Sequence, residues 1–220
     1  MFKFTVIVGA MIIVQSLPSY GNEITVQGVE MIDETIYTLE AAIVHIDALD
    51  SDQAGVSIEQ AEEFWNTFKE HHDFVYENEL TPSEEIWSLI SVITSAIENI
   101  VSTCGEIIDK QDTREVHTAI EELGKLKNLC TVPVLLDFTG ALCKSCKVMK
   151  DRLQTVANDV TGSARVVIID VNSQKKYSKE FKVMLIPTLV FIDTEGEEVE
   201  RHVGEMEVQA VIAELVKLSE

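Results

Sequence analysis

The order of secondary structure predicted for residues 131–218 restricts the fold of this chain more than any other feature. Short apolar runs rich in β-branched residues, typical of buried strands, alternate there with runs whose apolar residues recur at helical spacing. The predicted strands cover 131–138, 164–171, 186–193 and 198–203, and the predicted helices cover 144–160, 174–181 and 206–220. In chain order these elements run β-α-β-α-β-β-α, which predicts an α/β domain with a mixed central sheet flanked by helices.

Residues 22–128 follow a different pattern, which predicts an acidic bundle of three or four helices. Apolar residues recur at steps of three and four within 29–49, and further stripes follow Ser57, Thr81 and Asp112, each placed to cap a helix. Residues 22–128 hold 5 Lys and Arg against 24 Asp and Glu, whereas 129–220 hold 11 against 14. We therefore expect an all-α domain over 22–128 and the α/β domain over 129–220.

The charge of the chain argues against nucleic acid as a partner. With a formal net charge of −21, the chain lacks the basic footprint that phosphate binding requires. Most acidic residues of 22–128 lie opposite the apolar stripes, which favours a solvated surface over a docking surface for a basic partner. His71 and His72 are adjacent and would point about 100° apart on a helix, so we expect two solvated histidines and no metal site.

The N-terminus has the layout of a secretory signal. Lys3 precedes eleven uncharged and largely apolar residues, from Phe4 to Val14, and small residues follow at Ser19 and Gly21. A membrane anchor that stays uncleaved is the alternative, although a bilayer span needs about 20 residues. We expect a signal peptide over 1–21 and an exported protein, soluble in the bacterial periplasm after cleavage.

Two cysteines three residues apart, Cys143 and Cys146, lie in the stretch "DFTGALCKSCKVMK", where a predicted strand gives way to a helix. A structural zinc site needs four ligands, and the chain has no second close pair, so we expect no metal. A disulfide that closes so short a loop removes little entropy from the unfolded chain, which makes a purely structural role a poor explanation. The spacing therefore favours a redox pair.

The chemistry of thiols assigns a role to each cysteine of the pair. Only the thiolate is nucleophilic, and an ordinary thiol with a pKa of about 8.5 supplies little of it at neutral pH. At the start of a helix, unpaired backbone N–H groups and the helix dipole stabilise the Cys143 anion, and Lys144 and Lys147 add positive charge. We predict Cys143 as the nucleophile and Cys146, one turn later and more buried, as the residue that resolves the mixed disulfide. Asp137 lies in an apolar strand, so its pKa should be raised.

Residues 130–220 resemble the thioredoxin family at three places. The stretch "LLDFTGALCKSC" is similar to the family's strand, buried acid and active-site turn. "MLIPTLVFID" is similar to its cis-proline strand, and "TEGEEVERHVG" to its closing hairpin. The spacing between these three matches also fits the family.

The resemblance implies further roles. Asp137 would accept a proton from the second cysteine, and a cis Ile186–Pro187 bond would face Cys143. The Ile186 backbone and Leu142 would contact the substrate. An acid satisfied within a turn and an ordinary trans proline at a sheet edge are the alternatives for Asp137 and Pro187.

From this resemblance we expect an exported thiol-disulfide oxidoreductase without a cofactor. It would reduce disulfides of partner proteins with electrons from a membrane thiol carrier. Thioredoxins usually carry Trp-Cys-Gly-Pro-Cys, whereas this chain has Leu142 before the pair and Lys144 and Ser145 within it, which leaves oxidation and isomerisation open. The alternative is a partner-binding or assembly module whose acidic helices form the functional surface.

The other two cysteines, Cys104 and Cys130, have two interpretations. A cysteine on an apolar helix stripe is commonly a small core residue. In an exported protein the two could instead form a structural disulfide between the helical region and the α/β domain.

Overall fold

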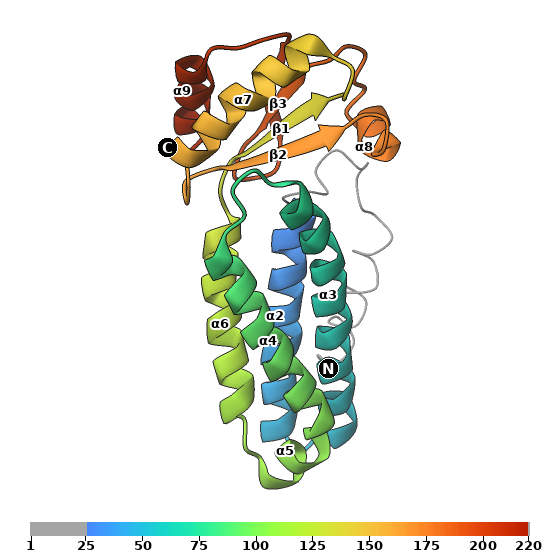
Figure 1. Ribbon diagram of the computed structural model, residues 1–220. Helices are drawn as coiled ribbons and strands as arrows, with labels where there is room; N and C mark the ends of the chain where they lie inside the picture. Colours follow the sequence, from blue (N-terminus) through green and yellow to red (C-terminus); the bar gives the residue numbers. More distant parts are fainter. Residues whose placement is uncertain (1–25, 220) are drawn as a thin grey trace.

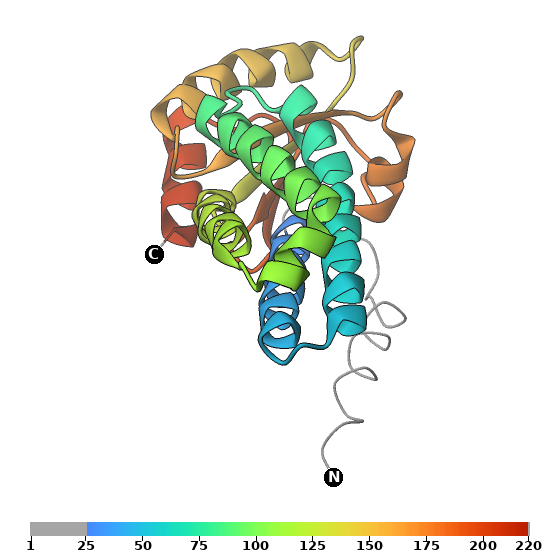
Figure 2. The ribbon, with the colours of Figure 1, turned by 90° about the horizontal axis from the view of Figure 1, so that it is seen from below.

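The computed structural model describes residues 26–219, so the predicted signal peptide over 1–21 lies outside the described residues. The helical region consists of α2 (Val26–Asp47), α3 (Ser51–Asn78), α4 (Glu84–Ser102), α5 (Cys104–Lys110) and α6 (Arg114–Cys130). The four long helices lie side by side as a bundle, and the short α5 lies at the end far from the sheet (Figures 1 and 2). The predicted all-α region is confirmed.

The predicted apolar stripes form the core of this bundle. α4 buries one residue per turn along a single face, namely Ile86, Ile90, Ile93, Ile97 and Ile100. Ile32, Leu39 and Ile46 of α2 are buried in the same cluster. Trp65 of α3 is also buried there, and its indole N–H donates to the Thr94 hydroxyl over 3.1 Å. The bundle is therefore held mainly by apolar burial, and the buried indole N–H of Trp65 has a hydrogen-bond partner.

Several helix starts differ from the prediction. α3 begins at Ser51, where the Asp50 side chain accepts from the Gln53 N–H, and Ser57 is buried inside the helix. α4 is capped by Ser83, whose hydroxyl accepts from the Ile86 N–H over 3.3 Å, instead of by Thr81. The caps predicted at Ser57 and Thr81 were wrong because several Ser, Thr and Asp residues precede each apolar stripe and any of them can accept from the first turn. The third, Asp112, does accept from the Arg114 N–H at the start of α6, over 3.4 Å.

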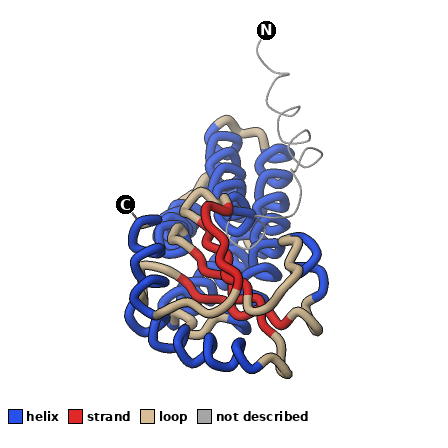
Figure 3. Tube along the Cα trace, turned by 90° about the horizontal axis from the view of Figure 1, so that it is seen from above, coloured by secondary structure: helices blue, strands red, loops and turns tan. Residues whose placement is uncertain are grey.

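The α/β half has the predicted order of elements. Its strands are β1 (Val134–Thr139), β2 (Arg165–Asp170), β3 (Thr188–Ile192) and β4 (Glu198–Val203), and its helices are α7 (Lys144–Asp159), α8 (Lys175–Glu180) and α9 (Val208–Leu218). The sheet order is β2-β1-β3-β4, with β1 and β2 parallel and the other pairs antiparallel. Figure 3 shows the strands with helices on their flanks. The mixed sheet is confirmed.

The two faces of the sheet pack against different partners. On one face, residues of α7 and α9 such as Leu153, Val156 and Leu215 pack on Leu135 of β1. On the other face, the apolar cluster includes Phe181, which follows α8, together with Val75, Leu136 and Phe138. Val75 belongs to α3, so the last turns of a bundle helix form part of the sheet's own core.

The chain leaving α3 also covers the free edge of β2. Glu79 forms a single antiparallel bridge with Val167, and the Leu80 N–H donates to the Val166 carbonyl over 2.9 Å. The Glu79 carboxylate lies 2.6 Å from the Arg165 guanidinium, and these two side chains are only 5% and 10% exposed. An uncovered strand edge presents unpaired backbone groups, so this segment both pairs the edge and fixes the bundle to the sheet.

One histidine of the adjacent pair was predicted wrongly. His72 is buried on α3, where its ring stacks near Phe68, Tyr76 and Trp87. Among residues 26–219, neither of its ring nitrogens has a hydrogen-bond partner. Burial, with a smaller contribution from the Arg165 cation, lowers the pKa of His72 to about 4, because desolvation disfavours the charged ring.

In the described part of the chain, no single helix has the length and hydropathy to cross a membrane. Among the helices described, only α4 and α5 taken together are long and apolar enough, and the two helices are bent by 69° relative to each other.

Candidate active site

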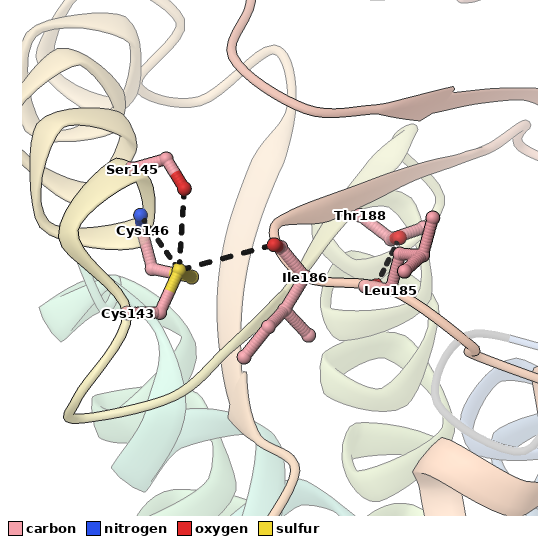
Figure 4. The surroundings of a disulfide bond; sticks show 6 residues. All are labelled: Cys143, Ser145, Cys146, Leu185, Ile186 and Thr188. Atoms are coloured by element: carbon pink, nitrogen blue, oxygen red, sulfur yellow. Dashed lines mark hydrogen bonds between the residues drawn. A yellow bond between two sulfur atoms is a disulfide. The ribbon is translucent and has the colours of Figure 1, made fainter.

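The cysteine pair forms a disulfide at the first turn of α7. Cys143 and Cys146 are bonded, with Cα atoms 5.2 Å apart. The turn after β1 is closed by the Cys143 N–H, which donates to the Gly140 carbonyl over 3.0 Å. Cys143 is the N-cap of α7, and its sulfur accepts from the Cys146 N–H over 3.1 Å (Figure 4). An N–H group of the first turn, which has no partner within the helix backbone, therefore donates to this sulfur, as the sequence predicts.

The two sulfurs differ in accessibility. Cys146 is 1% exposed, whereas Cys143 is only partly buried. The preceding Leu142 is 99% exposed. This confirms that Cys146 is the more buried of the pair, and it leaves Cys143 as the sulfur that a large substrate can reach.

The segment before β3 faces Cys143. The Ile186–Pro187 peptide bond is cis, as the resemblance implies. The Ile186 carbonyl oxygen lies 3.8 Å from the Cys143 sulfur, and the Ser145 hydroxyl lies 3.3 Å from the same sulfur. A hydrogen bond fixes this segment, because the Thr188 hydroxyl donates to the Leu185 carbonyl over 2.7 Å (Figure 4). Ile186 thus offers a backbone group beside the reactive sulfur.

Gly140 allows this close approach. A Cβ atom at Gly140 would lie 2.9 Å from the Ile186 Cδ1 atom and 3.6 Å from the Asn172 side-chain nitrogen. The glycine therefore leaves room for the Ile186 side chain to pack against the turn that carries Cys143. The role of Gly140 could not be predicted from the sequence, because nothing in the local sequence shows that a segment more than forty residues later packs on it.

Asp137 lies at the centre of β1 and is fully buried. Within residues 26–219, neither of its carboxylate oxygens has a hydrogen-bond partner. Burial raises the pKa of Asp137 to about 7, against a smaller opposing effect of the Lys150 cation. The predicted rise in pKa is confirmed, and it gives the carboxyl a midpoint at which it can both accept and release a proton near neutral pH.

This pKa predicts how stability depends on pH. A carboxyl with its ordinary pKa near 3.8 in the unfolded chain and about 7 in the folded chain favours folding at low pH, and this contribution is lost progressively as the pH rises from about 4 through 7. Between pH 5 and pH 8 the wild type should lose about 2–3 kcal/mol from this residue alone, and Asp137→Asn should not. Urea unfolding of both proteins at the two pH values measures the difference.

Comparing the two proteins cancels the contributions of all other titrating groups, His72 among them. Asp151→Asn, at an exposed position of α7, is the matched control and should behave as the wild type does. Equal losses of stability in the wild type and Asp137→Asn would show that Asp137 titrates in the folded protein as it does in the unfolded chain.

Lys144 and Lys147, predicted to tune the site, are exposed on the first turns of α7. The possible disulfide between Cys104 and Cys130 is absent, and both thiols are free. The reason is their placement. Cys104 begins α5 at the far end of the bundle, whereas Cys130 ends α6 beside the sheet (Figure 1). Cys130 is a buried core residue, and burial raises the pKa of its thiol to about 11.

Residues 26–219 contain no group of three or more His, Cys, Asp or Glu side chains placed to hold a metal ion. The structure brings together Cys143, Cys146, Leu142 and Ile186. It also adds Met184 and Leu185, which are exposed beside Ile186 and which no sequence motif indicated.

Comparison with known proteins places the α/β half in context. A family model described as Thioredoxin matches residues 122–217. The thioredoxin of Mycobacterium tuberculosis is 32% identical over 83 residues, which are 38% of this chain and 71% of that protein. The thioredoxin of Staphylococcus saprophyticus is 36% identical over 70 residues, which are 32% of this chain and 66% of that protein, so the match spans just under two thirds of that relative's length.

Among solved structures, a mutant thioredoxin from Halobacterium salinarum NRC-1 is 31% identical. That match covers 40% of this chain and 75% of that one, with a TM-score of 0.37.

Proposed function

Because this chain belongs to the thioredoxin family, whose members carry out thiol-disulfide exchange, we propose that Cys143 and Cys146 reduce disulfides of partner proteins. One observation carries the proposal. The pair forms a disulfide at the first turn of a helix, with one sulfur reachable from outside and the other buried. A structural disulfide has no need of this asymmetry, whereas a two-step exchange does.

The proposed reaction starts from the reduced protein. The Cys143 thiolate attacks one sulfur of the partner's disulfide, and the partner's other sulfur leaves as a thiolate and takes up a proton. Cys146 then loses its proton and attacks the Cys143 sulfur. This releases the partner's second thiol and leaves the Cys143–Cys146 disulfide described above, so two electrons have passed to the partner.

The surroundings of the pair support each step. The Cys146 N–H that points at the Cys143 sulfur, together with the start of α7, stabilises the attacking anion. Asp137, with its pKa raised to about 7, is the group that would take the proton from Cys146. The Ile186 backbone beside Cys143 is placed to pair with the extended substrate segment that carries the attacked disulfide.

We further propose that the protein works outside the cytoplasm, where a dithiol carrier in the membrane returns it to the reduced form. The secretory layout of residues 1–21 supports the location. The carrier is required by chemistry, because an oxidising compartment does not keep a close pair of thiols reduced on its own.

Trapping of the mixed disulfide tests the proposal. In Cys146→Ser the first step proceeds and the second cannot, so partner proteins should stay bound to Cys143 through a disulfide. Non-reducing gels and mass spectrometry of extracts from the native compartment should show these adducts, and a reductant should release them. The double variant Cys143→Ser/Cys146→Ser is the control and should trap nothing. Adducts that form equally well in the double variant would contradict the proposal.

A further inference from the structure

Basic residues are concentrated in the segments at the disulfide end of the sheet in this otherwise acidic protein. We define the redox end as residues 140–150 and 170–187, which hold the active-site turn, the first turns of α7, α8 and the segment before β3. These residues contain seven of the chain's 17 Lys and Arg residues and only two acids, Asp170 and Glu180, although the whole chain has a net charge of −21.

The topology brings both parts of the redox end to one place. β1 and β2 are parallel, so the turn after β1 and the segment after β2 leave the sheet at the same end. The Val171 N–H donates to the Thr139 carbonyl over 2.9 Å, which joins the two exits directly. α8 follows at this end (Figure 1), and the chain then returns to Cys143 through Ile186.

The lysines there are exposed to solvent, with Lys176 in an ion pair, whereas the two acids already have partners. Asp170 accepts from the backbone N–H groups of Asn172 and Ser173 over 2.8 and 3.1 Å, and Glu180 lies 4.0 Å from Lys176. The exposed lysines include Lys144, Lys147, Lys175, Lys179 and Lys182.

Exposed apolar side chains lie next to the sulfur. Leu142 is 99% exposed, Met184 is 89% exposed and Leu185 is 65% exposed. Leu142 directly precedes Cys143, and the other two directly precede Ile186. Large apolar side chains grouped in this way mark a surface that another molecule covers.

We propose that the preferred substrates carry apolar residues next to the attacked disulfide and aspartate or glutamate further along the same segment. This inference rests on the proposed function and names its substrate class. Apolar residues beside the disulfide would cover Leu142, Met184 and Leu185, and the outer carboxylates would pair with the surrounding lysines. The same lysines would repel a basic segment.

The acidic bundle does not prevent this approach. It packs beneath the sheet and along the edge of β2, away from the start of α7, where Cys143 lies (Figure 1). At physiological salt, interactions between exposed charges fade beyond about 8 Å. A substrate at the redox end therefore meets the exposed lysines there, while Glu205 and Glu207, which follow Gly204 beside Pro187, lie 3.6 and 3.1 Å from the Arg152 guanidinium.

Three peptides with one disulfide each test the substrate class. They share apolar residues beside the cysteines and carry outer residues that are acidic, neutral or basic. For the wild type, kcat/KM should be highest for the acidic peptide and lowest for the basic one, and raising the salt concentration should reduce the difference. In Lys175→Glu/Lys179→Glu/Lys182→Glu, kcat/KM should fall about tenfold for the acidic peptide, stay within about twofold for the neutral one and rise for the basic one.

A remote variant separates local from overall charge. Lys69→Glu/Lys110→Glu/Lys125→Glu changes the net charge equally on the helices of the bundle and should keep the wild-type order of peptides. The inference is wrong if both variants change kcat/KM for the three peptides alike, or if the wild type has the same kcat/KM for all three. In either case, reduction of the neutral peptide would still support the proposed function.

The acidic bundle of a second copy is another possible occupant of this surface. Sedimentation at low salt tests this occupant. A wild-type dimer that Lys175→Glu/Lys179→Glu/Lys182→Glu dissociates would assign the lysines to self-association and overturn the inference.

Discussion

Cys143→Ser is expected to abolish disulfide reduction, with a loss of at least about a thousandfold in the rate of insulin reduction by dithiothreitol. The reason is chemical. A serine hydroxyl stays protonated at neutral pH and cannot form the mixed disulfide through which exchange proceeds. The half-buried position of Cys143 and the fully buried position of Cys146 leave no second sulfur at the site that could replace it.

Cys104→Ser is the matched control, because Cys104 is a partly exposed free thiol at the far end of the bundle. This variant should reduce insulin at the wild-type rate. Retention of activity in Cys143→Ser, or its loss in Cys104→Ser, would show that the exchange does not take place at the start of α7.

Arg165→Met is expected to cause the largest loss of stability among single substitutions in the joint between bundle and sheet. It leaves the Glu79 carboxylate, which is 5% exposed, without the guanidinium 2.6 Å away. Removing one partner of a buried ion pair costs about 3–5 kcal/mol, because the remaining charge stays buried and uncompensated. Urea unfolding followed by circular dichroism measures this loss.

The double variant Glu79→Leu/Arg165→Met should recover most of the lost stability, since it removes both charges together. Lys125→Met, which breaks an exposed pair with Glu122, should change stability only slightly. If the double variant were as unstable as Arg165→Met, the loss would come from the packing of the Arg165 side chain and not from an unpaired charge.

The α/β half could be predicted closely from the sequence because its signals are local. Each predicted strand overlaps an observed one, and the order of elements is the predicted order. Asp137 and Cys146 are buried as expected, since an apolar strand and the inner face of a helix fix their surroundings within a few residues. The cis bond before Pro187 followed from the family motif and not from spacing.

The joint between the bundle and the sheet could not be predicted in the same way. Val75, Glu79 and Leu80 contact strands about ninety residues later in the chain, and their own neighbours indicate only the end of an acidic helix. The burial of His72 has the same origin, because the aromatic ring of Trp87 that covers it comes from the next helix. Such contacts depend on how elements pack, which a periodic pattern does not contain.

The gathering of lysines at the redox end was equally hidden. The sequence shows only that residues 129–220 are less acidic than the rest, because Lys182 and Lys144 lie far apart in the chain. Parallel pairing of β1 and β2 is what brings their segments to one end of the sheet. The charge of a surface therefore follows from topology as much as from composition.

The most direct test of the central claim is the acidity of the Cys143 thiol in the reduced protein. The rate of alkylation at Cys143, followed by mass spectrometry of Cys146→Ser between pH 4 and pH 10, reports the fraction of thiolate. A midpoint clearly below the ordinary value of about 8.5 is the expected result, because the start of α7 stabilises the anion. A midpoint at or above that value would contradict the assignment of Cys143 as the activated nucleophile.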